Sequence, residues 1–156
     1  MRKYKRATRA SSFSEFPPEI TAAIRKYAEK NDFGDFEADI LMCAETSSEK
    51  LKQGVFSKIF GDGKYALKTF VVVTPERVLW ATLDNKTNAA VLAARFSDVE
   101  VKDFSSPRIE DSGIEIFGFI DDFAGRGSAF IALGEDAAGH TLRRVLKAAA
   151  DDARRK

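Results

Sequence analysis

The sequence predicts a mainly β, α+β fold: a seven-stranded antiparallel sheet, bent or rolled into a partly open barrel. A C-terminal helix caps the sheet, and an N-terminal helix is added to it. Short segments that alternate apolar and polar residues follow one another from residue 36 to residue 134, with turn residues between them. One amphipathic segment of helical period precedes these strands and a longer one ends the chain, which together indicate a sheet covered by helices.

Length and charge limit the function classes. With 156 residues the chain has the size of one domain, and its 25 basic and 24 acidic side chains leave a net charge of +1. This balance argues against a general polyanion binder, so no nucleic-acid partner is expected. A single cysteine, Cys43, excludes an internal disulfide and favours the cytoplasm, where an inert core thiol is the usual role. No segment has the ~18 apolar residues of a membrane span.

The N-terminal part is predicted to consist of an arm and a helix. Residues 1–14 are basic and poor in apolar side chains, which predicts a disordered arm, either a solubilising tail or an electrostatic anchor for lipid or nucleic acid. Residues 15–33 predict a helix, because Pro17 and Pro18 suit a first turn and Gly34 suits a stop. The helix has one apolar stripe, made by Ile20, Ile24, Tyr27 and Ala28.

Residues 34–156 are predicted to form the main domain. Its strands are expected in FEADILMCAETS, KYALKTFVVVT, RVLWATL, AAVLAARF, DVEVKDF, GIEIFGFI and SAFIALG. The tetrad from Thr74 to Arg77 interrupts the most apolar stretch and predicts a type I turn, with Pro75 at its second position. In GIEIFGFI, isoleucines alternate with Glu115, Phe117 and Phe119.

The last segment, residues 135–155, predicts a helix that caps the sheet. Leu142, Val145, Leu146 and Ala149 recur at helical spacing. Acidic residues lie at its start and basic residues at its end, as the helix dipole favours.

From Phe36 to Arg155 the chain resembles pleckstrin-homology-like domains, especially the bacterial and GRAM-type variants. VVVTPERVLWA resembles the family's hairpin of a strand, a Thr-x-x-Arg turn and a Leu-Trp strand. ARFSDVEVKDF resembles the family's segment before the next strand, and GIEIFGF, FIALG and the final helix complete the pattern. The resemblance implies binding rather than catalysis. Some members hold phosphoinositide headgroups with basic residues around the loop between the first two strands, and others bind peptides or proteins.

The stretch that corresponds to that loop is SSEKLKQGVFSKIFGDGK. Its apolar residues at helical spacing within 51–60 either plug an end of the barrel or form an amphipathic segment for a membrane or a partner. KYALKTF offers only lysines where the family's phosphoinositide signature has an arginine, so specific inositol-phosphate binding is not expected. The candidate ligand or membrane-binding residues are Lys50, Lys52, Phe56, Lys58, Phe60, Lys64 and Lys68.

No catalytic residue, metal site or cofactor is predicted. The only histidine, His140, has no cysteine or histidine companion, and the paired acids Asp121 and Asp122 suit a turn. Trp80 is expected in the core rather than on a ligand platform. The sequence therefore predicts a non-catalytic interaction module for a protein partner or self-association. The alternative is peripheral binding to anionic membrane through the basic arm and the 50–64 loop.

Overall fold

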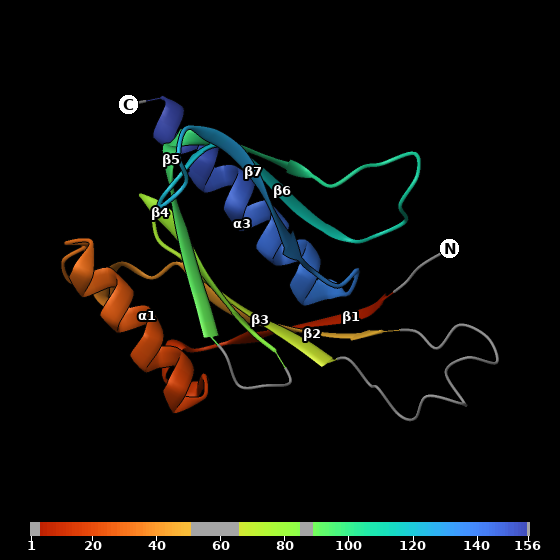
Figure 1. The fold of residues 1–156 in the computed structure, drawn as a ribbon, viewed down its shortest axis with the longest axis horizontal. Helices are drawn as coiled ribbons and strands as arrows, with labels where there is room; N and C mark the ends of the chain where they lie inside the picture. Colours follow the sequence, from red (N-terminus) through yellow and green to blue (C-terminus); the bar gives the residue numbers. More distant parts are fainter. Residues whose placement is uncertain (1–3, 51–65, 85–88, 156) are drawn as a thin grey trace.

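The computed structural model describes residues 4–50, 66–84 and 89–155, which form a seven-stranded antiparallel sheet with two α-helices (Figure 1). The strands pair in chain order, with β1 and β7 at the edges, and the sheet does not close into a barrel. This confirms the predicted fold class. The strands are β1 (Tyr4–Ser11), β2 (Met42–Lys50), β3 (Ala66–Val73), β4 (Arg77–Leu83), β5 (Ala89–Asp103), β6 (Gly113–Ile120) and β7 (Arg126–Ala132). The helices are α1 (Pro18–Lys30) and α3 (Ala137–Arg154), and short 3-10 turns cover Phe13–Glu15 and Phe36–Asp39.

Strands β3 and β4 are buried on both faces. Val71 and Trp80, which are register partners, belong to one core cluster, whereas Val72 and Leu79 belong to another. Neighbouring residues of a strand point to opposite faces, so a continuous apolar run such as Phe70–Val73 has a partner on each side. The most hydrophobic stretch of the chain is therefore the middle layer of the molecule.

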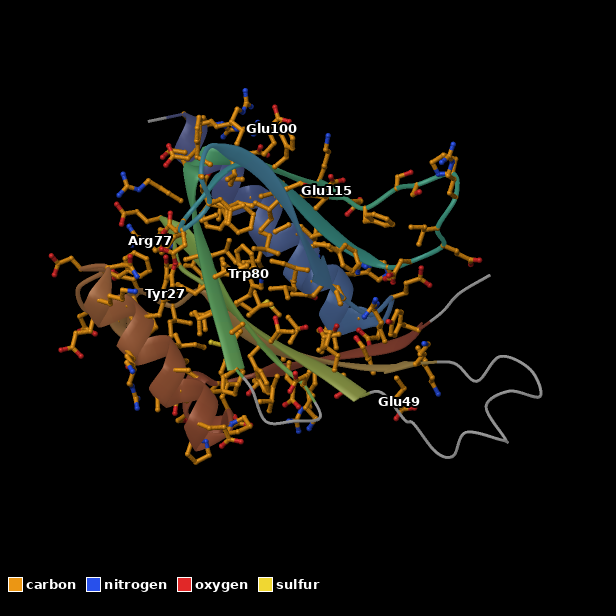
Figure 2. All side chains as sticks on the ribbon, viewed as in Figure 1. Tyr27, Glu49, Arg77, Trp80, Glu100 and Glu115 are labelled. Carbon is orange, nitrogen blue, oxygen red and sulfur yellow. The ribbon has the colours of Figure 1, made fainter. Side chains whose placement is uncertain are left out.

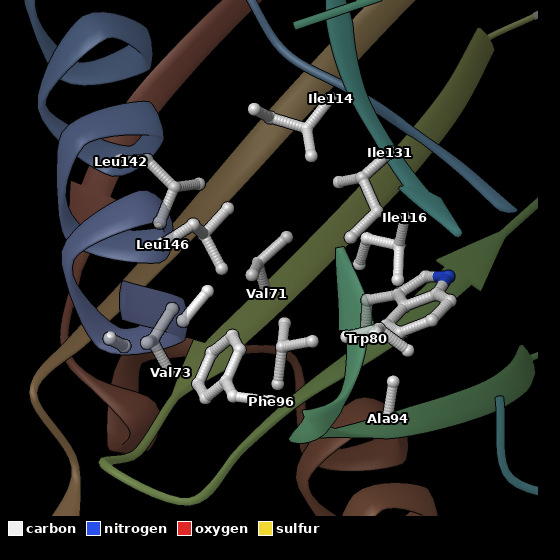
Figure 3. Close-up of a cluster of buried hydrophobic side chains, with 14 of the residues drawn as sticks. Val71, Val73, Trp80, Ala94, Phe96, Ile114, Ile116, Ile131, Leu142 and Leu146 are labelled. Carbon is white, nitrogen blue, oxygen red and sulfur yellow. The ribbon is translucent and has the colours of Figure 1, made fainter. Parts of the chain in front are cut away.

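Helix α3 lies within the bend of the sheet and covers its inner face (Figure 1). Its fully buried Leu142 and Leu146 point toward Val71 and Ile114, as Figure 3 shows. Asp136 caps the helix, because its Oδ1 accepts a hydrogen bond from the Gly139 N–H at 2.9 Å. Gly139 is required here, since a Cβ would collide with the Gly134 carbonyl.

Helix α1 packs on the opposite, outer face, against strands β4 and β5. Ile20 and Ile24 are fully buried, and the Phe16 ring meets Phe70 edge-on with centroids 5.0 Å apart. The helix ends at Lys30 and is capped by Asn31, and the next residue, Asp32, has a positive φ of 57°. The predicted N-terminal helix is confirmed, and it forms the second core.

The chain reverses between β3 and β4 at the predicted tetrad, and Thr74 bonds back to the backbone as expected. The Thr74 N–H donates to the Arg77 carbonyl at 3.0 Å, and the Thr74 Oγ1 accepts from the Arg77 N–H at 3.1 Å. The Thr74 side chain is buried, so its hydroxyl, rather than water, is the hydrogen-bond partner of the Arg77 N–H.

The prediction of a disordered arm over residues 1–14 is wrong for Tyr4–Ser11, which form β1 and pair with β2 along its length. The basic composition of this segment gives no strand pattern, because two of its inward side chains are polar and bind polar partners instead of packing in an apolar core. The Arg6 guanidinium is 6% exposed and donates from Nε and Nη2 to Asp111 at 2.7 and 2.8 Å. Arg6 Nη1 also donates to Ser48 Oγ.

Thr8 ties the same strand to the loop that follows β7. Its N–H donates to Asp136 Oδ2, and its Oγ1 accepts from the Gly134 N–H, both at 2.8 Å. Thr8 Oγ1 also shares a hydrogen bond of 2.7 Å with Thr46 Oγ1. These bonds connect the two ends of the sheet where no strand pairing does so.

The strand boundaries differ from the prediction at two further places. AAVLAARF and DVEVKDF are one long strand, β5, whose pairing with β6 shifts register between Ala94 and Val99. At this bulge Gly118 has a φ of 141° and lies so close to the Asp98 carbonyl that a Cβ would clash. In FEADILMCAETS the strand starts only at Met42, because Phe36–Asp39 form a 3-10 turn whose Phe36 fills the outer core.

We expect Arg6→Ala to lower the free energy of unfolding by about 3 kcal/mol, because it leaves the carboxylate of a largely buried ion pair without its guanidinium. Urea denaturation of the full chain measures the change. Arg9→Ala is the matched control: Arg9 also lies on β1 and pairs with Glu45 at 2.8 Å, but its side chain is 70% exposed. Its substitution should cost no more than about 0.5 kcal/mol. Equally small effects of both substitutions would contradict a stabilising role for the buried ion pair between Arg6 and Asp111.

Candidate interaction surface

Only two of the predicted binding residues, Lys50 and Lys68, lie among the described residues. Lys50 ends β2 and pairs with Tyr4, whereas Lys68 on β3 pairs with Ser47. Positions 47 and 50 of one strand point to opposite faces, so the structure does not bring these two lysines together. The Lys68 Nζ lies 3.4 Å from Glu45 Oε1, and Glu45 also binds Arg9. The remaining candidates, Lys52, Phe56, Lys58, Phe60 and Lys64, lie outside the described residues.

The position of the predicted binding loop in the strand order also changes. Because β1 precedes it, the segment 51–65 connects β2 to β3 rather than the first strand to the second. The connection between the first two strands instead contains α1 and the two 3-10 turns. The expected correspondence with the family's headgroup loop concerns residues that are mostly outside the described ranges, and it stays a prediction.

A different surface gathers exposed apolar side chains on strands β6 and β7. We call it the outer aromatic face, defined by Phe117, Phe119, Phe130 and Arg126. Its three phenylalanines are 38, 54 and 38% exposed. Exposed phenylalanine is unusual on a soluble protein unless it contacts a partner, and these three lie on the outward side of one hairpin.

The alternation along β6 produces this face. Ile114, Ile116 and Ile120 point into the inner core, so Glu115, Phe117 and Phe119 point outward. Helix α1 covers the outer face over β4 and β5, and no described helix packs over β6 and β7. The sequence showed this alternation, but it gave no reason to treat outward phenylalanines as a site, since the element that covers them could not be foreseen.

The rings are held in place within the chain. The Arg126 guanidinium carbon lies 5.3 Å from the Phe117 ring centroid and 5.8 Å from that of Phe119. Phe130 meets Phe104 edge-on at 5.0 Å. The face is therefore preorganised, which lowers the entropic cost of binding. The Phe123 ring of the β6–β7 turn is 40% exposed but lies against Gly127 on the inward side of β7, where a Cβ would meet it at 2.9 Å, so it is not part of this face.

Charged residues of opposite sign flank the rings. Glu100 of β5 is the register partner of Phe117 on one side, and Arg126 of β7 is the partner of Phe119 on the other. Glu115 lies between Lys102 of β5 and Phe130 of β7. Figure 2 shows Glu100 and Glu115 on the outside of the β5–β6 part, away from the buried Trp80. The β5 side of the aromatic row thus has an acid level with Phe117 and a base level with Glu115, and the β7 side has the base Arg126 level with Phe119.

A second polar cluster joins the C-terminal end of α1 to the β6–β7 turn. The Tyr27 hydroxyl donates to Asp122 Oδ2 at 2.8 Å, and burial, followed by this hydrogen bond, raises the pKa of Tyr27. Burial also raises the pKa of Asp121, and the nearby Arg77 partly offsets this. Arg77 stacks on Phe33 at 3.8 Å, and its Nη1 is buried without a hydrogen-bond partner in the described ranges. The paired acids occupy a turn, as the sequence predicted.

The remaining residues singled out in the sequence have structural positions. Trp80 is 3% exposed in the inner core, which confirms the prediction for it. His140 is exposed in the first turn of α3. Cys43 is buried in the outer core, where burial raises the pKa of its thiol to about 12. Within residues 4–50, 66–84 and 89–155 there is no cluster of three or more histidine, cysteine and acidic side chains placed to hold a metal ion.

We expect Cys43 to be unreactive in the folded protein at pH 8, because both burial and the raised thiol pKa suppress the thiolate. Ellman's reagent should label Cys43 of the native chain slowly, at the rate at which local unfolding exposes the thiol. In concentrated urea the labelling should be immediate. Rapid labelling without denaturant would contradict the buried position.

Comparison of the chain with known protein families, with curated proteins and with solved structures found no match. None of the described helices combines the length and apolarity needed to cross a membrane. A functional interpretation therefore rests on the surface itself.

Proposed function

We propose that this chain is a non-catalytic, pleckstrin-homology-like interaction module that contacts a protein partner through the outer aromatic face. The observation that carries the proposal is the set of three exposed phenylalanines, Phe117, Phe119 and Phe130, on the outward side of one hairpin. Protein interfaces are enriched in aromatic residues and arginine at their centre, and this face combines both. The non-catalytic part rests on the sequence, in which no nucleophile, base and acid form a recognisable set.

The alternative, peripheral binding to anionic membrane, is less favoured by the described contacts. Two cations of the supposed basic arm, Arg6 and Arg9, are engaged by Asp111 and Glu45. The outer aromatic face has acidic neighbours in Glu100 and Glu115, which an anionic lipid surface would repel. Protein contact is therefore the better-supported function.

A photoreactive phenylalanine analogue in place of Phe119 tests the proposal. Illumination of cells that make the protein should yield one discrete adduct of higher mass, because position 119 lies within the contact. The matched control carries the analogue at Leu41, which has the same exposure of 54% but lies at the start of β2. No adduct at position 119, or the same adducts at both positions, would contradict the proposal.

Liposome co-sedimentation distinguishes protein contact from the alternative function, binding to anionic membrane. We expect the chain to stay in the supernatant with vesicles of neutral or anionic phospholipid at ~0.15 M salt, where surface attraction is screened within ~8 Å. Pelleting with anionic vesicles that weakens steeply with salt and is abolished by Phe56→Asp with Phe60→Asp would favour the membrane function instead.

A further inference from the structure

Two charged residues beside the outer aromatic face are complementary across a two-fold axis. The acidic Glu100 lies on the β5 side of β6, and the basic Arg126 lies on the β7 side. A two-fold axis that runs parallel to β6 and in the plane of contact exchanges these two sides. Strand β5 of one copy then faces β7 of the other, so unlike charges meet on both sides of the axis.

From this geometry, and resting on the function proposed above, we propose that the partner is a second copy of the chain. The two outer aromatic faces pack as aligned sheets, with β6 against β6. Sheets packed face to face lie ~10 Å apart, which leaves room for Phe117 and Phe119 of both copies to interdigitate.

The register places the charged groups within reach of each other. Glu100 is level with Phe117, and Arg126 is level with Phe119, two positions further along β6. At ~3.4 Å per residue the offset along the strand is about 7 Å, which two long side chains span. Lys102 lies beside Glu115 and balances the acid nearest the axis.

Two further properties favour a copy of the same chain. The net charge of +1 means that two copies repel each other little over long distance. The rings are already held by Arg126 and Phe104, so few rotamers are lost on contact.

The size of the face sets the expected strength. Strand β6 has 8 residues, so the face is about 27 Å long, and three strands ~4.8 Å apart make it about 14 Å wide. Two such faces bury less than the ~1,200 Å² of a stable complex. We therefore expect a reversible dimer with a dissociation constant on the order of 100 µM.

Sedimentation equilibrium of the full chain from about 10 µM to about 1 mM tests this expectation. The wild-type chain should move from monomer to dimer across that range. Phe119→Asp should raise the dissociation constant at least about 10-fold, because it places a charge at the centre of the contact. Leu41→Asp, the control of equal exposure, should leave the dissociation constant unchanged. Circular dichroism checks that each variant is folded, and Phe117→Ser provides a second, uncharged disruption of the same contact.

A charge exchange tests the two-fold arrangement itself. Glu100→Arg and Arg126→Glu should each weaken the dimer about 5-fold or more, and the double variant should bind more tightly than Arg126→Glu alone. Arg126→Glu and the double variant both lack the stacking of Arg126 on Phe117 and Phe119. The difference between their dissociation constants therefore isolates the contribution of the intermolecular pair between positions 100 and 126. No recovery in the double variant would overturn the two-fold arrangement.

A wild-type chain that stays monomeric at about 1 mM would overturn the inference, as would a dimer that is insensitive to both phenylalanine substitutions. Neither result would remove the proposed function. In that case the adduct formed at position 119 would have a mass other than twice that of the chain, and the partner would be a different protein. A missing adduct together with a monomer would remove both.

Discussion

The structure depends on one constraint: strands β3 and β4 are apolar on both faces, and each face needs its own cover. Helix α3 shields Val71 and Trp80 from water on the inner side, and α1 shields Val72 and Leu79 on the outer side. Neither cover is dispensable, since an exposed row of aliphatic side chains on the central strands would expose much of the apolar surface that stabilises the fold. The bend of the sheet around α3 and the insertion of α1 between β1 and β2 both serve this requirement.

The same constraint explains where a partner surface remains. Helix α1 has 13 residues and packs against β4 and β5, while β6 and β7 lie beyond it. On these last strands the inner face is aliphatic and buried, and the outer face has phenylalanines with no described helix over them. Strands β3, β4 and β5 are covered on both faces, and β6 and β7 are covered on one. The outward phenylalanines of β6 and β7 are the basis of the interaction that we propose.

Much of the fold could be predicted from local pattern. Both helices, the β3–β4 hairpin and the alternation of β6 depend on residues close in sequence. The first strand could not be predicted, because Arg6 and Thr8 bind residues more than 100 positions away, at Asp111 and Gly134. Strand β5 was split at the bulge near Asp98, whose geometry depends on Gly118 of another strand. The outward phenylalanines were visible in the sequence, but whether a helix covers them is decided only by tertiary packing.

The bonds of Thr8 have a consequence for the order in which the chain can become native during synthesis. Thr46 lies on the next strand, so β1 can pair with β2 as soon as both have been made, but the other partners of Thr8, Gly134 and Asp136, come much later in the chain. The core between β3 and β5 forms from neighbours and can be in place by then. The bonds of Thr8 to Gly134 and Asp136 therefore form late, and they join the two edges of a sheet whose centre is already folded.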